Sequence, residues 1–276
     1  MNKTLSKSPI VEIVAELRWG QQPDTTIQLQ QSAAGVPVPL IAMNSSKLDE
    51  FFMRFGGEVY QQGFQRAERM VPSGFPLMLF QPVYRYRKSS ETDGSVLYQA
   101  GPGLFSANAI PPYRSWNEFS PVVQSGIEAL LRARDSTELN APFTSVSLRY
   151  IDAFGPDLTE GHDIESFLRD VLGIFVSMPA GLSKLITHGQ KVKPLIQLAL
   201  PLANNMNMNL GVGMGMVNNE VAIIMDTTVS TSEVISADIT SVMTTLHAAR
   251  AVIHELFFNL TAPIQHLMQP LENEQL

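Results

Sequence analysis

Alternation of apolar and polar residues predicts one strand near the start of the chain and another at its middle. In residues 10–19, IVEIVAELRW, every second residue from Val11 to Trp19 is apolar, and the charged residues fall on the opposite face. Residues 143–154, FTSVSLRYIDAF, alternate in the same way. A period of two is typical of a strand with one buried face. Both segments are therefore predicted to be half-buried strands.

After the first strand, the pattern predicts a loop and then a short helix. Residues 20–45 are rich in Gln, Pro and Gly and lack periodicity, which favours a long loop. A helix is expected from Leu48 to about Phe55, with Ser46 as its cap and Gly56-Gly57 at its end.

The rest of the first half predicts strands followed by a long helix. Residues 76–88 and 95–110 are expected to be strands joined by a turn in SSETDG. Ser115 and Glu118 have the spacing of a capping box, in which each side chain accepts a hydrogen bond from an otherwise unpaired backbone N–H. Apolar residues then recur at helical spacing, so a helix is expected up to about Arg134.

The second half repeats this order of elements. A short helix is expected over 164–172, whereas 174–193 has no clear pattern. Residues 205–216, NMNMNLGVGMGM, alternate strictly, and a turn at Asn218-Asn219 leads into a further strand, EVAIIMDTTV. A last helix is expected over 236–260, since Pro263 limits its extension.

Together these elements predict an α+β fold of two similar units, 1–142 and 143–276, or one continuous domain built from both. Each unit has the order strand, short helix, several antiparallel strands and long helix. This order resembles the duplicated architecture of the TATA-binding protein, as an analogy of pattern that implies nothing about DNA binding. Internal duplication is an interpretation, because VAELRW and SVSLRY correspond only loosely.

Composition excludes several classes of protein. The chain has no cysteine, which excludes disulfides, thiol catalysis and cysteine-ligated metals. At 45% hydrophobic residues it can bury a sizeable core. Its start lacks the apolar run of a signal peptide, and no stretch approaches the ~20 apolar residues of a membrane span. We therefore expect a cytoplasmic protein with no membrane partner.

Charge is distributed unevenly. Up to Pro142 there are 13 Lys and Arg against 13 Asp and Glu; from Phe143 onward there are 6 against 13, which accounts for the net charge of −7. An acidic half is poorly suited to phosphate neutralisation, so nucleic-acid binding is not expected there. In the first half, the cations and aromatic residues around Arg85 and Arg87 are compatible with nucleic-acid binding, although a solvated surface is the simpler interpretation.

No motif predicts a catalytic, cofactor or metal site. The GVGMG run has Met216 where a dinucleotide fingerprint needs glycine, and no helix begins after it. His247 and His254 are two helical turns apart, roughly 10 Å, which is too far to share one metal. The simpler interpretation is that both histidines are structural or flank a polar site. Neither a GxSxG elbow nor a phosphate-binding GxxxxGK loop occurs.

Two arginines are the best candidates for recognition. Arg18 and Arg149 lie near the ends of corresponding strands, on the face opposite the apolar one. They could line a groove that binds a carboxylate, a phosphate or an acidic protein surface. Solvation, or pairing with nearby carboxylates such as Glu12 or Glu16, is the simpler alternative.

Several segments resemble a prokaryotic family that is sporadically distributed among bacteria and archaea and has no assigned activity. They are Pro9-Ile10-Val11-Glu12, Pro112-Tyr113-Arg114-Ser115-Trp116, Leu148-Arg149-Tyr150-Ile151-Asp152 and, in the last helix, Leu246-His247, Phe257 and Thr261. Asp152 departs from the pattern, which has Asn there. The patchy distribution implies an accessory gene, such as part of a defence, immunity or toxin-neutralising cassette.

The lack of a catalytic motif, the acidic second half and the patchy distribution of the family together predict non-enzymatic binding of a protein partner through a sheet face or groove. The acidic second half suggests a basic partner. The alternative is an enzyme or sensor that binds a phosphorylated small molecule or nucleotide through the two arginines. The candidate binding residues are Arg18, Arg149, Tyr150, Asp152, Tyr113, Trp116, His247 and His254.

Overall fold

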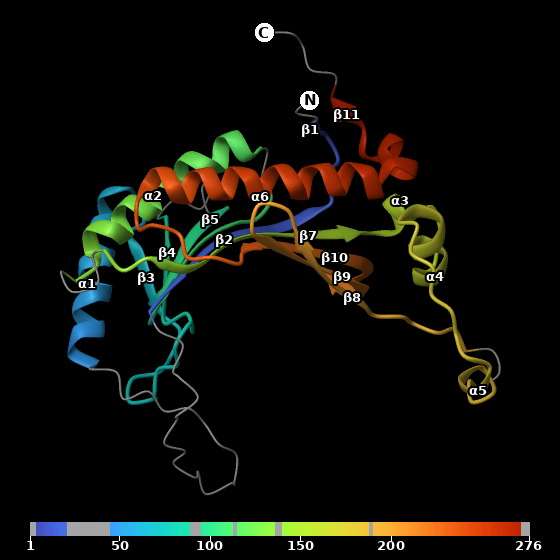
Figure 1. Ribbon diagram of the computed structural model, residues 1–276, viewed down its shortest axis with the longest axis horizontal. Helices are drawn as coiled ribbons and strands as arrows, with labels where there is room; N and C mark the ends of the chain where they lie inside the picture. The colour runs from blue at the N-terminus through green and yellow to red at the C-terminus, as the bar shows by residue number, and fades with distance from the viewer. Residues whose placement is uncertain are drawn as a thin grey trace, which may run out of the picture. The chain divides into compact units, whose positions relative to one another are not determined.

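The amphipathic strands pair into a large open antiparallel sheet that is accompanied by helices, so the α+β class is confirmed (Figure 1). The computed structural model describes residues 4–20, 45–88, 95–112, 115–135, 140–187 and 190–271. Nine of the described strands follow the hydrogen-bonded order β3-β4-β5-β6-β2-β7-β10-β9-β8, and β1 pairs with β11 separately. The strands are β1 (Thr4–Leu5), β2 (Ile10–Trp19), β3 (Arg66–Arg69), β4 (Tyr84–Arg87), β5 (Val96–Gly101), β6 (Leu104–Ala109), β7 (Phe143–Phe154), β8 (Ile196–Leu202), β9 (Met206–Val217), β10 (Glu220–Thr231) and β11 (Pro270–Leu271).

By their internal contacts the residues divide into two compact units. Unit 1 contains Met1–Glu12, Arg149–Val229 and Ala249–Leu276, and unit 2 contains Ile13–Leu148 and Ser230–Ala248. Neither unit is a single stretch of chain, and the division into 1–142 and 143–276 stays a prediction. None of the described helices is long and apolar enough to cross a membrane, and the cytoplasmic location also stays a prediction.

The core of unit 2 is aromatic. The predicted apolar face of β2 is buried, and helix α1 (Ser45–Gln61) packs against the same side of the sheet. The ring of Phe55 in α1 meets the rings of Tyr86, Tyr98 and Phe105 at centroid distances of 5.2, 6.4 and 5.7 Å. These mutual edge contacts hold the helix on β4, β5 and β6.

Helix α1 is longer than its sequence predicts. It continues through Gly56-Gly57 to Gln61, so the expected end at these glycines is wrong. Phe52, Phe55 and Val59 form one buried stripe, and burial of this stripe outweighs the low helix propensity of the two glycines. The turn that ends the helix uses Gly63, whose φ of 93° favours glycine.

The strands that follow are shorter than predicted. Of 76–88, only Tyr84–Arg87 forms a strand, because Pro76 and Pro82 cannot donate ladder hydrogen bonds. The predicted single strand 95–110 is a hairpin of β5 and β6, turned at Gly103 with φ 66°. Strand β3 was not predicted, and the turn expected in SSETDG lies outside the described residues.

Helix α2 (Trp116–Ala133) begins where the capping pattern predicts. The Ser115 hydroxyl accepts a hydrogen bond from the backbone N–H of Glu118 at 3.4 Å. The chain leaves the helix at Arg134. The predicted start and end of this helix are therefore both confirmed, because caps and an apolar stripe are local signals.

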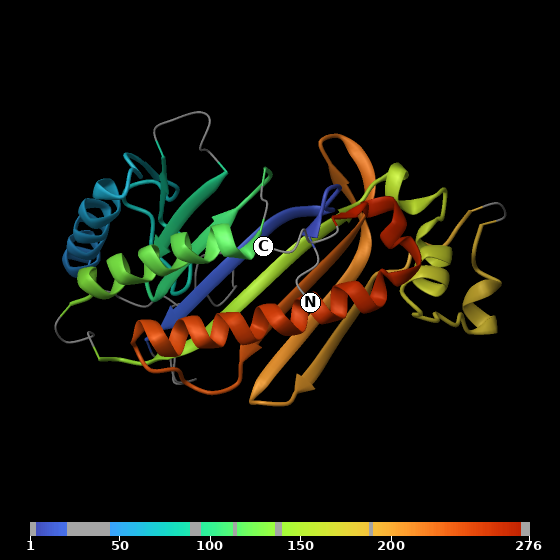
Figure 2. The same ribbon diagram turned by 90° about the horizontal axis from the view of Figure 1, so that it is seen from above.

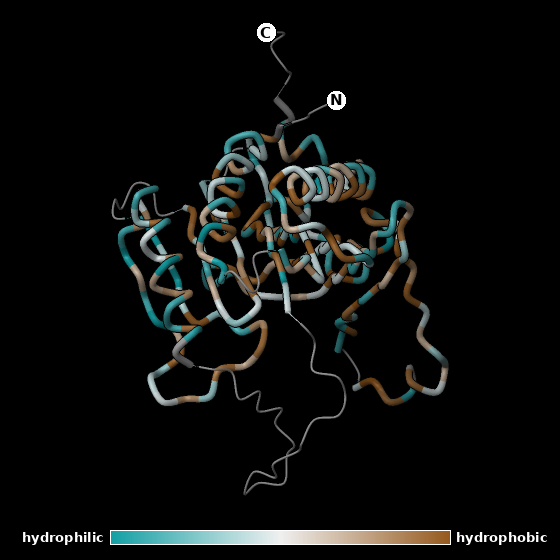
Figure 3. Tube along the Cα trace, turned by 60° about the vertical axis from the view of Figure 1, so that its left-hand side comes forward, coloured by the Kyte–Doolittle hydropathy of each residue, from teal (hydrophilic) through white to brown (hydrophobic). Residues whose placement is uncertain are grey.

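Unit 1 is built on the end of β7 and on the strands β8, β9 and β10. Helix α6 (Ile239–Leu260) contributes its residues from Ala249 onward, and apolar positions recur along it (Figure 3). Phe257 of this helix stacks on Phe154 of β7, with centroids 6.5 Å apart. The core continues through helices α3 (Pro156–Thr159) and α4 (Ile164–Ser166), the π-helical turn η2 (Phe167–Val171) and the 3₁₀ turn η3 (Ala262–Met268).

Strand β8 is the outermost strand on the unit 1 side of the order, and the sequence did not predict it (Figure 2). It pairs with β9 in antiparallel register, Leu198 opposite Leu210 and Pro201 opposite Asn207. The residues between its ends are all exposed. The helix α5 (Ala180–Ser183) lies in the preceding segment 174–193, whose sequence has no clear pattern.

Candidate functional site

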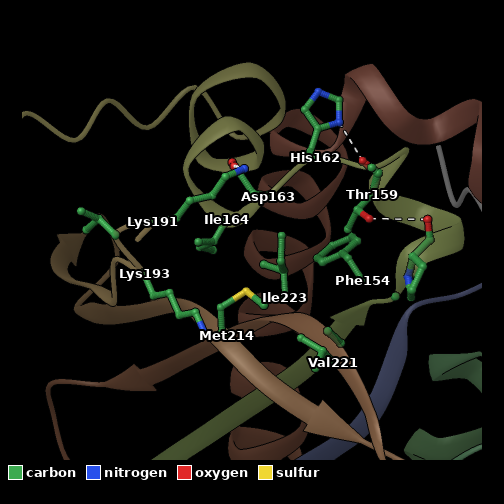
Figure 4. A pocket seen from close by; sticks show the side chains of 15 residues that line it. Phe154, Thr159, His162, Asp163, Ile164, Lys191, Lys193, Met214, Val221 and Ile223 are labelled. Atoms are coloured by element: carbon green, nitrogen blue, oxygen red, sulfur yellow. Dashed lines mark hydrogen bonds and ion pairs between the residues drawn. The ribbon is translucent and has the colours of Figure 1, made fainter. Parts of the chain in front are cut away.

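A pocket of about 340 Å³ opens in unit 1 between the loop after β7 and the β9–β10 hairpin. Its lining comes from Phe154–Pro156, Thr159, Gly161–Ile164, Lys191–Lys193, Met214 and Val221–Ile223 (Figure 4). The hairpin turns at Asn218-Asn219, as predicted, and both residues have positive φ. Volumes of about 300–1,000 Å³ are usual for sites that bind small molecules.

The floor of the pocket is apolar. Phe154, Ile164 and Ile223 are buried and belong to the core of unit 1. Met214 and Val221, on neighbouring strands of the hairpin, are exposed at the wall. The apolar face predicted for 205–216 is therefore buried only from Met206 to Val212, and at Met214 it borders the pocket.

One side of the rim is an ion pair. Asp163 caps α4 by accepting a hydrogen bond from the backbone N–H of Ser166 at 3.0 Å, and Lys191 Nζ donates to its other oxygen at 2.7 Å. Hydrogen bonds from Lys191 and Ser166 hold the pKa of Asp163 well below its usual value. This carboxylate is thus ionised and already satisfied.

Besides Thr159, the other polar side chains of the pocket are those of His162 and Lys193. His162 Nδ1 lies 2.7 Å from the carbonyl oxygen of Thr159, which can only accept, so Nδ1 carries the proton and Nε2 is the remaining ring nitrogen. Lys193 is exposed and has no carboxylate partner in the part of the chain that is described. The pocket therefore combines an apolar floor with one unmatched positive charge.

The two arginines predicted to line a groove are each ion-paired. Arg18, in unit 2, contacts Glu16 at 2.7 Å, one of the internal pairings that the sequence suggested. Arg149, in unit 1, donates from Nε to Asp226 Oδ1 at 2.8 Å and from its terminal nitrogen to Asp226 Oδ2. A carboxylate or phosphate ligand would have to compete with these partners. Their role in binding stays a prediction.

Asp152 is the most unusual of the predicted residues. Its side chain is 2% exposed, and among the described residues Oδ1 has no hydrogen-bond partner. Burial, with a smaller contribution from the nearby Asp226, raises its pKa to about 8. At neutral pH the carboxyl is therefore mainly protonated and uncharged, as the amide of Asn would be. Its neighbour Tyr150 is half-buried.

The structure brings together two predicted residues from distant parts of the chain. The indole N–H of Trp116 donates to Nδ1 of His247 at 2.9 Å, and the two rings meet edge to face at 5.6 Å. The contact joins the first turn of α2 to α6 within unit 2. His254 belongs to unit 1, where its ring lies 4.6 Å from that of Phe258. Tyr113 lies outside the described residues.

The cations around Arg85 and Arg87 lie on the paired strands β3 and β4 at one end of the strand order. In β3 and β4, Arg66 stands opposite Arg87 and Glu68 opposite Arg85, with Arg85 and Glu68 3.7 Å apart. The neighbouring Tyr86 is buried against α1 and donates to the carbonyl oxygen of Phe52. This aromatic ring is part of the core and is not available to stack on a base.

No protein-family model, curated protein or solved structure matches this chain. The resemblance to the sporadically distributed prokaryotic family therefore stays a prediction. No group of three His, Asp or Glu side chains within the described ranges could hold a metal ion. The sequence pointed to neither the pocket nor β8. The sequence did contain one sign that this region is unusual: residues 171–219 contain Lys184, Lys191 and Lys193 but no Asp or Glu.

Proposed function

We propose that this chain is a protein-binding protein that docks an extended segment of its partner along β8. The observation that carries the proposal is the exposure of an uncharged outermost strand. Its sequence is IQLALPL; Leu198 and Leu200 are 39% and 38% exposed, and Leu195 just before it is 81% exposed. Edge strands are usually protected by charged residues, because their free backbone groups pair readily with another strand.

The backbone of β8 can pair with a second strand over the residues before Pro201. Pro201 has no N–H, so it fits an edge strand with its nitrogen directed away from the neighbouring strand β9, and it offers a partner strand no donor at that position. Backbone orientation repeats every second residue in a strand. Ala199 and Gln197 therefore direct their N–H and C=O groups outward, where a partner strand can bond to them.

Charge favours a particular kind of partner. The segment 171–219 carries three lysines and no carboxylate, although the chain as a whole has a net charge of −7. Phe175 and Leu185 in this segment are 80% and 79% exposed. A partner segment that is apolar with neutral or acidic flanks suits this surface better than the basic partner suggested by the acidic second half.

The test uses two variants at one position. Ala199→Pro removes an outward N–H and places a ring in the path of a pairing strand, whereas Ala199→Ser keeps the N–H. The tagged full chain is purified from its host at moderate salt, and mass spectrometry identifies proteins retained in stoichiometric amounts. The proline variant should bind the purified partner at least about tenfold more weakly, equivalent to about 1.4 kcal/mol, and the serine variant should bind as the parent does.

Equal affinity of both variants would contradict docking on β8. Loss of binding on charge reversal of several carboxylates after Phe143, with Ala199→Pro unaffected, would instead support a basic partner on the acidic surface. The same experiment addresses the expected place in a defence or toxin-neutralising cassette, which rests on the family resemblance alone. The alternative of a phosphorylated ligand at Arg18 and Arg149 stays a prediction.

Internal duplication remains part of the proposal. In the strand order, β2 is followed outward by β6, β5, β4 and β3, and β7 is followed outward by β10, β9 and β8. Among the strands of this order, which leaves out the separate pair β1 and β11, the first strand of each half therefore neighbours the last strand of the same half. This correspondence supports two related halves with a TATA-binding-protein-like order, and the second half has one strand fewer.

A further inference from the structure

The pocket in unit 1 is a separate feature from β8 and is not explained by protein docking. Its wall leaves Met214 and Val221 exposed in a concave site, although apolar residues on the same face of β9 are buried further along. Covering such side chains with an apolar ligand is favourable, because the surface removed from water is apolar on both sides. The pocket therefore fits a ligand with an apolar body.

The rim specifies the charge of the ligand. Lys191 is directed to Asp163, as Figure 4 shows, and this pair is neutral overall. Lys193 lies beside Met214 and has no carboxylate partner among the described residues. A ligand with one negative charge would neutralise Lys193 without disturbing the ion pair.

We propose that this pocket binds an amphipathic monoanion of the carboxylate class, such as a medium-chain fatty acid. The hydrocarbon chain packs against Phe154, Ile223 and Met214, and the carboxylate pairs with Lys193. The small volume limits the body to a single chain or ring.

Titration calorimetry of the full chain tests the proposal with matched probes. Decanoate has the required chain and charge, decanol has the chain without the charge, and acetate has the charge without the chain. We expect decanoate to bind about tenfold more tightly than decanol, since the pair with Lys193 is the difference between them. Acetate should give no measurable heat. Equal binding of decanoate and decanol, or no binding of decanoate, would overturn the proposal.

Variants identify the residues responsible. Lys193→Gln should weaken decanoate about tenfold and leave decanol unchanged. The matched control is Lys184→Gln, an exposed lysine that does not line the pocket, and it should leave both affinities unchanged. Val221→Trp adds a ring at the wall and should weaken both ligands. Identical effects of the two glutamine variants would show that the charge of Lys193 is not used.

The two proposals can fail separately. Ala199→Pro acts on the outer edge of β8 and should leave decanoate binding intact. Val221→Trp acts at the pocket wall on β10 and keeps all three lysines of residues 171–219, so it should weaken decanoate and leave binding of the protein partner intact. Loss of decanoate binding in Ala199→Pro would contradict a pocket that is independent of β8.

Discussion

The outermost strands of the two units differ sharply in chemistry. In unit 2, β3 has the sequence RAER, and its charged side chains include Arg66 and Glu68. In unit 1, β8 is longer and has no charged residue. Charges protect an edge because a pairing strand would have to desolvate them. Unit 2 therefore ends in an edge protected by charge, whereas the edge of unit 1 has no charge and Pro201 is the residue in it that limits pairing.

The interiors of the units also differ in composition. Unit 2 buries the rings of Phe55, Tyr86, Tyr98 and Phe105 in one cluster. Exposed aromatic rings and buried unpaired polar atoms occur in both units, for example Phe75 and Gln62 Oε1 in unit 2, and Phe175 and Asp152 Oδ1 in unit 1, among the described residues. The uncharged edge strand and the pocket are therefore the features that place both proposals in unit 1.

The largest effect is expected from the same substitution made in each unit. Phe55→Ala removes a ring that contacts three others in the core of unit 2 and should lower the free energy of unfolding by about 3–5 kcal/mol. Phe175→Ala, at a highly exposed position of unit 1, should change it by less than about 0.5 kcal/mol. Urea denaturation followed by circular dichroism measures both. A large loss for Phe175→Ala would mean that this ring is structural.

The second prediction concerns the buried carboxyl of unit 1. The pKa of Asp152 is about 8 in the folded protein, above its unfolded value. Stability from the neutral carboxyl is therefore complete below the unfolded pKa and is lost as the pH rises towards 8. Because Asn never ionises, Asp152→Asn should gain stability relative to the parent by about 1.4 kcal/mol per pH unit within this window. Urea denaturation at several pH values checks the slope.

Asp163→Asn is the matched control, and its effect on the free energy of unfolding should have the opposite sign to that of Asp152→Asn. Since the folded pKa of Asp163 is depressed by Lys191 and Ser166, its stabilisation is present above the unfolded pKa and is lost as the pH falls through the folded one. This variant should be less stable than the parent at neutral pH, and the difference should shrink in acid. Parallel pH profiles for Asp152→Asn and the parent would contradict an ionisation at Asp152.

The smallest effect is expected from making the unit 2 edge resemble β8. Replacing Arg66 and Glu68 of β3 with leucine removes two exposed charges without touching the core. The double variant should self-associate weakly, with a change of a few fold in dimer population at high concentration. Sedimentation velocity measures this population. A fully monomeric double variant would mean that charge on β3 is not what protects this edge.

Local signals in the sequence predicted much of the fold. The strands β2, β7, β9 and β10 follow from alternation, and α2 follows from its cap and apolar stripe. Strand β8 has no such signal. Most of its residues are exposed on both faces, so its sequence does not alternate between apolar and polar residues. The continuation of α1 through two glycines depends on aromatic residues of β4, β5 and β6, which are distant in sequence.

The candidate site was harder to predict because it also depends on contacts between residues that are distant in sequence. Trp116 and His247 were both candidates, but their hydrogen bond joins residues 131 positions apart. The pocket combines three segments, each of which is unremarkable alone.

The amino-acid sequence was enough to predict the elements with a buried face, the absence of thiol chemistry and the uneven charge. These follow from periodicity and composition, which are properties of neighbouring residues or of the whole chain. The packing of distant segments settled which strand forms an edge, that Oδ1 of Asp152 is buried without a partner among the described residues, and that Lys193 lies beside an apolar pocket. Each depends on which distant residues come together, because burial and pairing are set by packing rather than by local sequence.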